Sequence, residues 1–237
     1  FAHSDDLKGI ADSASILLED SGIFIIEVSY LLDVLEKNLF DTIYHEHLAY
    51  HSIKPLSNFF LQNDFELIDI LRVNSHGGSV RVIAQKRGGS YPVSRSVLDI
   101  LKLETEMKLD KIETYYIFSE NIKKLKEELQ LLLNNLKEDG KSIAAFGAPA
   151  KATTLMYHFD IGPEIIDFIV DDSPLKQGLF SPGKHIEIVS SSEIEKRNPD
   201  YLLILAWNFS ESIMKKHSDF KSRGGHFITP LPTIQVH

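Results

Sequence analysis

Residues 142–151 read SIAAFGAPAK, a short apolar run that ends at a glycine and leads directly into a possible helix. Further apolar runs follow at residues 165–170, 201–207 and 226–229, and a helical pattern covers residues 210–221. Strands that alternate with helices predict a parallel sheet with right-handed crossovers. The last hundred residues are therefore expected to form an α/β domain of the Rossmann-like type.

The carboxyl ends of the predicted strands are where such a sheet binds its ligand. The turn from Gly147 opens a helix, whose free N–H groups suit a phosphate, and Lys151 adds a positive charge. Asp171 and Asp172 follow at about the spacing of a ribose-binding carboxylate. However, the turn has one glycine where the dinucleotide fingerprint has three, so a plain turn with an acidic pair that caps the next segment remains an alternative.

Two segments around this domain are distinctive. Residues 176–183 form a loop marked by glycine and proline, which either closes over a ligand or is an ordinary surface loop. Residues 96–136 contain neither glycine nor proline, and their leucines and isoleucines recur at three- and four-residue steps. This pattern predicts one long helix or two, acting as a connector or as a surface for self-association.

Residues 40–51 read FDTIYHEHLAYH and combine two tyrosines, three histidines, an aspartate and a glutamate. A buried core segment would have to pair each of these polar atoms, and a solvated loop has little reason to interleave them with apolar residues. The composition therefore predicts a catalytic segment. For Tyr50 and His51, ordinary packing is the favoured interpretation.

The first part of the chain has a simpler pattern. Residues 7–18 predict a helix, 23–28 a strand covered on both faces, and 56–61 a short helix after Pro55. Residues 65–73 and 80–85 predict two strands of a hairpin, joined through a glycine-containing turn at residues 74–78. His76 in that turn is, on its own, more typical of a turn residue than of a ligand.

The composition excludes several classes of protein. Acidic residues outnumber basic ones by 34 to 25, and no long basic run occurs, so nucleic-acid binding is not expected. The chain has no cysteine, which rules out disulfides and thiolate metal sites. No apolar run is long enough to span a bilayer, so a cytoplasmic location is expected. Since the chain begins at Phe1, on what resembles the end of a strand, a preceding piece is expected to be missing.

Several groups of residues occur in a recognisable order: Phe40-Asp41 before Tyr44-His45-Glu46-His47, His76-Gly77-Gly78-Ser79 with Arg81, Gly147 to Ala152, Asp171-Asp172, Lys176-Gln177-Gly178, Pro182-Gly183 and Ala206-Trp207-Asn208. Together they resemble the S-adenosylmethionine-dependent sugar C-methyltransferases of deoxysugar biosynthesis. Each group alone is weak evidence for this resemblance, but the groups together extend, in order, through essentially the whole chain.

The resemblance implies a three-part enzyme: a cysteine-rich zinc-binding domain, a class I methyltransferase domain, and a C-terminal Rossmann-like domain that helps to hold the nucleotide of a dTDP-linked keto sugar. Without cysteine, or a glycine-rich loop for S-adenosylmethionine, this chain is expected to be the C-terminal portion. Residues 1–90 would be the second half of the methyltransferase domain, residues 91–140 a helical connector, and residues 141–237 the nucleotide-sugar domain. Zinc would belong to the absent N-terminal domain.

The resemblance also implies chemistry and residues. Methylation next to a ketone needs a base and a group that stabilises the enolate oxygen. The family pattern makes His47 the general base, Tyr44 its partner or the donor to the carbonyl, Glu46 an orienting group and His3 a further carbonyl donor, with His45 and His51 as alternatives. The implied substrate-binding residues are His76, Gly77, Arg81, Gly147, Lys151, Asp171, Asp172, Lys176, Trp207 and Asn208. Trp207, the only tryptophan, would otherwise be a core residue.

Two other kinds of protein remain open. His45, His47 and His51 can be read as ligands of a divalent metal, although no matching carboxylate ligand is evident. The chain can also be a module that binds a nucleotide sugar, or associates with itself, without catalysis. As an isolated chain it is expected to be inactive, because the donor site needs strands it does not contain.

Overall fold

The computed structural model describes all 237 residues, which form two compact units. The first unit comprises Phe1–Asn38 and His45–Phe118, and the second comprises Leu39–Tyr44 and Ser119–His237. The chain therefore passes between the units three times, and one of these passages interrupts the predicted catalytic segment, between Tyr44 and His45.

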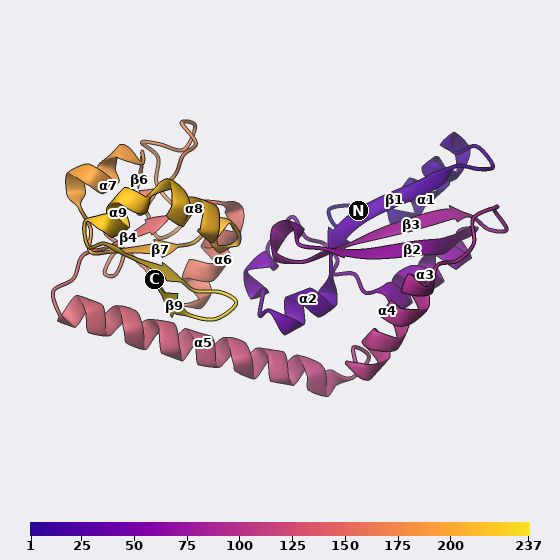
Figure 1. Ribbon diagram of the computed structural model, residues 1–237, viewed down its shortest axis with the longest axis horizontal. Helices are drawn as coiled ribbons and strands as arrows, with labels where there is room; N and C mark the ends of the chain where they lie inside the picture. Colours follow the sequence, from indigo (N-terminus) through magenta and orange to yellow (C-terminus); the bar gives the residue numbers. More distant parts are fainter. The chain divides into compact units, whose positions relative to one another are not determined.

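The first unit is built on a three-stranded antiparallel sheet, with the strand order β1-β3-β2 (Figure 1). Its elements are α1 (Leu7–Leu17), β1 (Ile23–Ser29), α2 (Leu31–Glu36), α3 (Ile53–Gln62), β2 (Phe65–Val73), the 3-10 turn η2 (Ser75–Gly77), β3 (Ser79–Lys86) and α4 (Arg95–Glu106). β3, the second strand of the hairpin, thus lies between β1 and β2.

One face of this sheet packs against helices. Ile26, Val82 and Ile70 stand side by side on the three strands and are buried with Ala11 of α1 and Phe60 of α3. Because successive side chains on a strand point to opposite faces, Ile23, Ile25 and Leu71 point the other way, and each is more than 40% exposed. β1 forms an edge of the sheet.

A buried glutamate joins two helices of the first unit. Glu104 of α4 is 3% exposed and accepts hydrogen bonds from the Tyr30 hydroxyl and from the backbone N–H groups of Ile53 and Lys54. These two N–H groups begin α3, where no intrahelical partner exists. The carboxylate therefore caps α3 from a residue about 50 positions away and fixes α3 to α4.

The second unit contains a six-stranded sheet with the order β6-β5-β4-β7-β8-β9, of which the first five strands are parallel. Its elements are η1 (Phe40–Thr42), most of α5 (Ile112–Glu138), β4 (Ile143–Phe146), α6 (Ala150–His158), β5 (Ile169–Val170), β6 (Ile188–Val189), α7 (Ser192–Arg197), β7 (Tyr201–Ile204), η3 (Trp207–Phe209), α8 (Ser210–Lys216), α9 (Ser218–Ser222), β8 (His226–Thr229) and β9 (Gln235–Val236).

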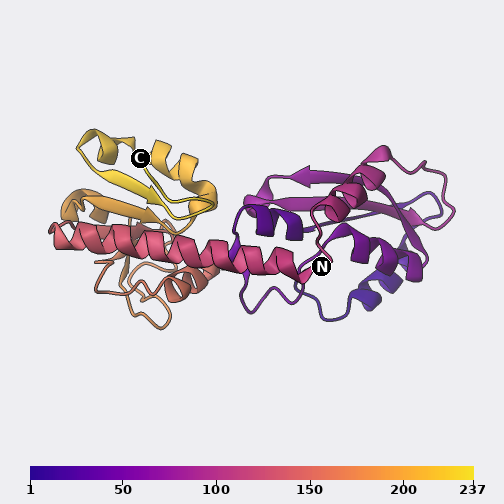
Figure 2. The same cartoon turned by 90° about the horizontal axis from the view of Figure 1, so that it is seen from below.

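Helices cover both faces of this sheet. Ile194 of α7, Ile213 of α8 and Phe220 of α9 pack with Phe146 and Leu202 on one face. The other face of β4 is equally buried, as are Leu129 and Leu133 of α5 and Leu155 and Met156 of α6. Viewed from below, α5 lies in front of this sheet (Figure 2). The mixed α/β class predicted from the sequence is therefore confirmed.

Several element boundaries differ from the prediction. The strand expected at residues 165–170 is only Ile169–Val170, because the N–H groups of Ile165 and Ile166 bond to Gly162 in a turn. The helical region expected at residues 96–136, as one long helix or two, is two helices, α4 and α5, in agreement with the second alternative; a turn in which Lys108 has φ of 53° separates them. The helix expected at residues 210–221 is likewise divided at His217. The sequence pattern did not predict α2, β6, α7 or β9.

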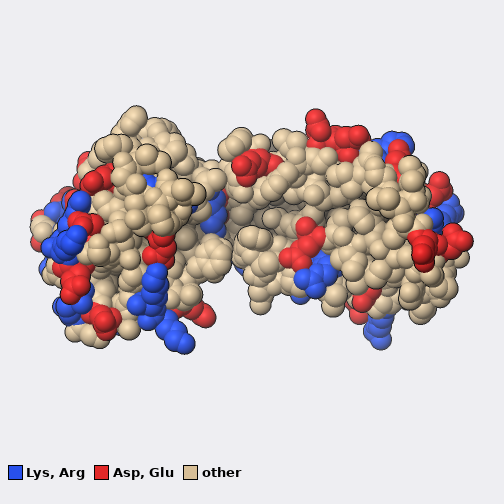
Figure 3. All heavy atoms as spheres, turned by 90° about the horizontal axis from the view of Figure 1, so that it is seen from above, with Lys and Arg blue, Asp and Glu red and all other residues tan.

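The surface carries charges of both signs. On the face shown in Figure 3, lysine and arginine side chains are interspersed with aspartate and glutamate and form no continuous basic area. None of the helices combines the length and apolar character needed to cross a bilayer.

The Glu104 cap generates a prediction about stability. Replacing Glu104 with alanine leaves two N–H groups and a hydroxyl unpaired in the interior, which should lower the free energy of unfolding by about 3 kcal/mol. Urea denaturation of the whole chain measures this. The control is Glu106→Ala on the same helix, which removes only an exposed pair with Lys102 and should cost about 0.5 kcal/mol or less. Equal effects of the two substitutions would show that the cap contributes nothing.

Candidate functional site

The histidine-rich segment has little regular structure. After the 3-10 turn η1, the residues from Ile43 to Tyr50 form neither helix nor strand, and only His51 makes an isolated bridge, with Tyr30. A segment that is not part of a helix or a sheet depends on side-chain contacts and single hydrogen bonds for its position. Such contacts therefore position its two parts, residues 39–44 in the second unit and the residues from His45 onward in the first.

Two predicted catalytic residues are brought together in the first unit. The imidazole rings of His3 and His47 are stacked, with centroids 5.1 Å apart and planes inclined by 19°. The Tyr50 ring meets His47 edge-on at 6.0 Å, and the Leu48 N–H donates to the Ala2 carbonyl at 3.0 Å. The stacking therefore brings together two imidazoles, a type of side chain that serves as a general acid or base in catalysis.

The other two predicted catalytic residues flank the point where the chain passes between the units. Glu46 is exposed, and its carboxylate lies 3.9 Å from Nε2 of the neighbouring His45. Tyr44 is half-buried and is the last residue of the segment that belongs to the second unit.

The turn that carries His76 has an unusual backbone. His76 and Gly77 both have positive φ, 54° and 96°. The Ser75 hydroxyl donates to Glu27 at 2.6 Å, and Arg81 donates to the same carboxylate through Nε and Nη2 at 3.0 and 2.7 Å. These bonds, with that of Ser75 the strongest, lower the pKa of Glu27. Arg81 is therefore engaged in an ion pair in which two of its N–H groups donate to one oxygen, Oε2, of Glu27, and its side chain is 45% exposed.

The base of the same turn is held by a buried carboxylate. Asp33 is 2% exposed and lies 2.8 Å from both Lys37 Nζ and Arg72 Nη2. Lys37 also donates to the Gly77 carbonyl at 2.9 Å. A Cβ on Gly78 would lie 2.4 Å from the Cβ of Asp33, so only glycine permits this approach. No local sequence pattern pointed to Asp33, because its contacts involve residues of other elements such as Arg72.

In the second unit, the turn after β4 is tied to the loop after β5. The Ala148 N–H donates to Asp171 Oδ2 at 2.7 Å, and Lys176 Nζ lies 2.9 Å from the Ala148 carbonyl and 3.3 Å from the same Oδ2. Asp171 Oδ1 accepts from the Ser173 N–H, which is the capping arrangement that the sequence left open. Gly147 has φ of 94°, and a Cβ there would lie 2.5 Å from the Cβ of Ala206.

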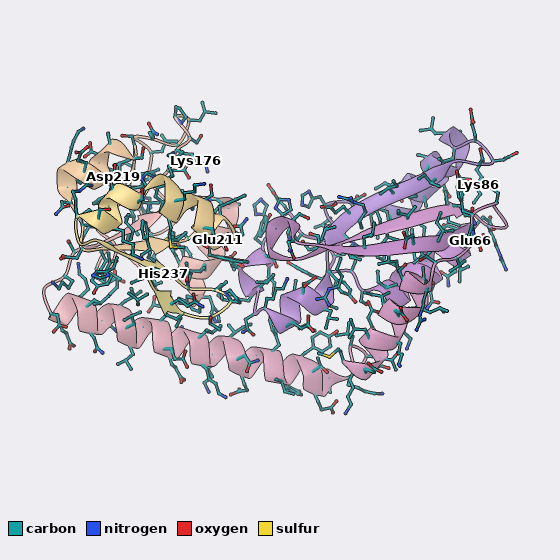
Figure 4. All side chains as sticks on the ribbon, in the orientation of Figure 1. Glu66, Lys86, Lys176, Glu211, Asp219 and His237 are labelled. Atoms are coloured by element: carbon teal, nitrogen blue, oxygen red, sulfur yellow. The ribbon has the colours of Figure 1, made fainter.

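A cavity of about 230 Å³ lies beside this turn, and most of its walls are apolar. The start of α6 and the loop 176–182 line it, including Ala148, Pro149, Thr153, Lys176 and Phe180. Of the residues that line the cavity, only Lys176 is basic; it is labelled in Figure 4. Its side chain is 40% exposed.

Lys151 and Trp207 are both largely enclosed by the second unit. The Lys151 side chain is 14% exposed, and its ammonium lies 3.7 Å from the fully buried Asp41 carboxylate and 4.1 Å from the centre of the Trp207 ring. Trp207 donates its indole N–H to the same carboxylate at 2.6 Å. Burial raises the pKa of Asp41 and lowers the pKa of Lys151, while their mutual attraction opposes both changes.

The remaining predicted residues lie near the carboxyl ends of the strands. Asp172 forms an ion pair with Lys216 at 2.7 Å. The side-chain oxygen of Asn208 is buried without a hydrogen-bond partner. Asp41 was part of the motif noted in the sequence, but it was given no role. Its position directly after Leu39-Phe40 and two residues before Ile43 was the available signal, because a carboxylate in a largely apolar stretch needs a partner.

The structure gives no support to a histidine metal site. No group of three or more histidine, aspartate or glutamate side chains is placed so that it could hold an ion. His51 is 8% exposed, its Nε2 is buried without a partner, and burial lowers the pKa of this imidazole.

Comparison with known proteins identifies the family. The model of the C-methyltransferase C-terminal domain family matches residues 74–232. The C-methyltransferase NovU of Streptomyces niveus is 34% identical over 236 residues, which cover 100% of this chain and 56% of that protein. This chain thus spans little more than half the length of its relative. The relationship that the motifs indicated is confirmed: the chain belongs to the C-methyltransferase family and corresponds to the C-terminal portion of its members.

Proposed function

We propose that this chain is the portion of a C-methyltransferase that binds a dTDP-linked keto sugar and removes the proton from the carbon next to its ketone. The observation that carries the proposal is the stacked pair of His3 and His47, directly beside the Tyr44–Glu46 segment. A methyl group can be added to carbon only after that carbon has become nucleophilic, so a base and an oxyanion donor are the minimum requirement.

The residues of the pair divide these tasks. Neutral His47 takes the proton from carbon, and the electrons of the broken C–H bond move to the carbonyl oxygen as the enolate forms. His3 or the Tyr44 hydroxyl donates a hydrogen bond to that oxygen, and Glu46 orients its neighbours. S-adenosylmethionine, when bound, would supply an electrophilic methyl group to the resulting carbon and leave as S-adenosylhomocysteine. We assign no residue of this chain to the donor, because the chain lacks a glycine-rich loop that would hold it.

The sheet order of the first unit supports a partial methyltransferase domain. In a class I methyltransferase the last strands form a hairpin whose final strand inserts beside the fifth, which is the order seen in β1-β3-β2. β1 would then be the fifth strand, and its open edge would pair with the strand that ends near His3. The exposed Ile23, Ile25 and Leu71 would be covered by helices of the preceding half.

The cavity of the second unit is the proposed nucleotide site. Its apolar walls suit a base, and the start of α6 offers backbone N–H groups to a phosphate. An ammonium has three N–H donors, and Lys176 uses two of them within the protein, so one remains for a phosphate oxygen. In this arrangement Asp171 and Gly147 shape the site rather than contact the ligand. The same cavity favours the alternative function, a module that holds a nucleotide sugar without catalysis.

The proton-removal step can be tested without a methyl donor. In D2O, this chain should catalyse deuterium incorporation at the carbon next to the ketone of a dTDP-linked keto sugar, measured by mass spectrometry. His47→Asn should slow this exchange by about 100-fold or more, because a positioned base contributes that much.

The control for this experiment is His226→Asn, at an exposed histidine of β8 that the mechanism does not use. It should exchange at the rate of the unaltered chain. Exchange that stays at the uncatalysed rate in the unaltered chain, while dTDP still binds, would favour the binding module.

The nucleotide site generates a separate prediction. Lys176→Met should raise the Kd for dTDP about tenfold, as expected for one lost charged contact of about 1.4 kcal/mol. Equilibrium dialysis with dTDP measures this. Lys184→Met is the matched control, because Lys184 is on the same loop but pairs with Asp160 and does not line the cavity. If both variants bind dTDP as the unaltered chain does, the nucleotide lies elsewhere.

A further inference from the structure

Residues 39–44 are packed into the second unit, although the chain on both sides of them belongs to the first. Phe40 lies between two aromatic rings of the end of α6, with centroids 4.7 Å from His158 and 5.1 Å from Phe159. The Thr154 hydroxyl donates to the Ile43 carbonyl at 3.3 Å. Phe40, Asp41 and Thr42 are all buried. This short segment is thus part of the core of a unit that otherwise begins about 75 residues later.

Three groups meet where this segment reaches the sheet. Asp41 Oδ2 accepts from the Trp207 indole at 2.6 Å and lies 3.7 Å from Lys151 Nζ, which stands 4.1 Å from the centre of the indole ring. Each of the three side chains therefore contacts the other two. Asp41 and Trp207 are buried and the Lys151 side chain is 14% exposed, so removing one partner leaves the others without compensation.

The position of this contact is informative. Lys151 begins α6 after β4, and Trp207 follows β7. β4 and β7 are neighbours, and the chain leaves β4 toward β5 on the opposite side, so this is the point where an open parallel sheet usually binds its ligand. The chain places its own carboxylate there. The close approach of Gly147 to Ala206 leaves little further space between the two strand ends.

We propose that Asp41, Lys151 and Trp207, which we call the Asp41 clamp, are positioning residues that fix the catalytic segment to the nucleotide-binding unit, and that Lys151 does not bind the phosphate. This inference rests on the proposed function for the meaning of Tyr44–His47. It changes the sequence-based assignment of Lys151 and Trp207 from substrate contacts to internal supports.

Chain geometry limits how far the effect of the clamp reaches. Consecutive Cα atoms are about 3.8 Å apart, so Tyr44 lies within about 11 Å of Asp41, and His47 lies within about 11 Å of Tyr44. Fixing Asp41 therefore limits where Tyr44, the last residue of this segment in the second unit, can lie. A mobile segment would lose the near-attack geometry that proton transfer requires.

The clamp contains the only tryptophan of the chain, so its fluorescence reports on the contact directly. Asp41→Asn keeps an acceptor for the indole but leaves the Lys151 ammonium without its counter-charge. We expect the emission to shift to longer wavelength, acrylamide quenching to rise about threefold, and hydrogen exchange of residues 39–47 to accelerate at least tenfold. The double variant Asp41→Asn/Lys151→Met, which removes both charges, should restore exchange to within about threefold of the unaltered chain.

The control for general destabilisation is Asp200→Ala. Asp200 lies in the same unit, just before β7, at the ends of the strands opposite to the clamp. Its carboxylate accepts hydrogen bonds from the Ser142 N–H and the Ser142 hydroxyl and forms an ion pair with Lys141. It should lower the Tm while leaving Trp207 emission and the exchange of residues 39–47 unchanged. If it changes them as much as Asp41→Asn does, the clamp has no local role.

Nucleotide binding separates this inference from the proposed function. If the Asp41 clamp acts as proposed, Asp41→Asn and Lys151→Met should each keep the Kd for dTDP within twofold of that of the unaltered chain. Each should slow deuterium exchange into the keto sugar at least tenfold. A Kd that rises tenfold in Lys151→Met, with residues 39–47 still protected, would overturn the clamp and return Lys151 to the phosphate. Fluorescence and hydrogen exchange decide the matter even if dTDP does not bind, an outcome that counts against the proposed function alone.

Discussion

The buried carboxylate of Asp41 is the constraint on which the second unit and the catalytic segment both depend. A carboxylate cannot remain ionised in an apolar interior without partners, and this one is met by an ammonium and an indole N–H from two different strand ends. Because these partners are on α6 after β4 and in the segment after β7, the buried position of residues 39–44 depends on contacts with two separate parts of the parallel sheet. The position of Tyr44 is thus set by residues more than 100 positions later in the chain.

The same physical device recurs in the first unit. Asp33 is buried between Lys37 and Arg72 and supports the turn that carries His76, and Glu104 caps α3 from α4. In each case an acidic side chain from one element satisfies groups of another, which joins elements that a small hydrophobic core would hold only loosely. Polar contacts of this kind have direction. They can therefore fix where a histidine or a turn lies, which apolar burial alone does not.

The sequence predicted the parts of this molecule that rest on local pattern. The strand β4 and its turn at Gly147 were predicted from an apolar run that ends at a glycine. The hairpin was predicted from two strand-like runs on either side of His76-Gly77-Gly78. Two-residue strands such as β6 carry no such pattern, since their pairing partners define them. The contact between Lys151 and Asp41 was not predictable, because nothing in the local sequence around a lysine at the start of a helix indicates a partner more than 100 positions away. His3 and His47 were each named as candidates from the family resemblance, whereas the stacking of their rings is seen only in the structure.

The central claim is that this chain carries the nucleotide-sugar half of a C-methyltransferase. Calorimetric titration with dTDP and, separately, with S-adenosylhomocysteine tests it most directly. The account predicts that dTDP binds at one site per chain and that S-adenosylhomocysteine shows no binding, because the residues that hold the donor are not assigned to this chain. Binding of S-adenosylhomocysteine without binding of dTDP would contradict the account.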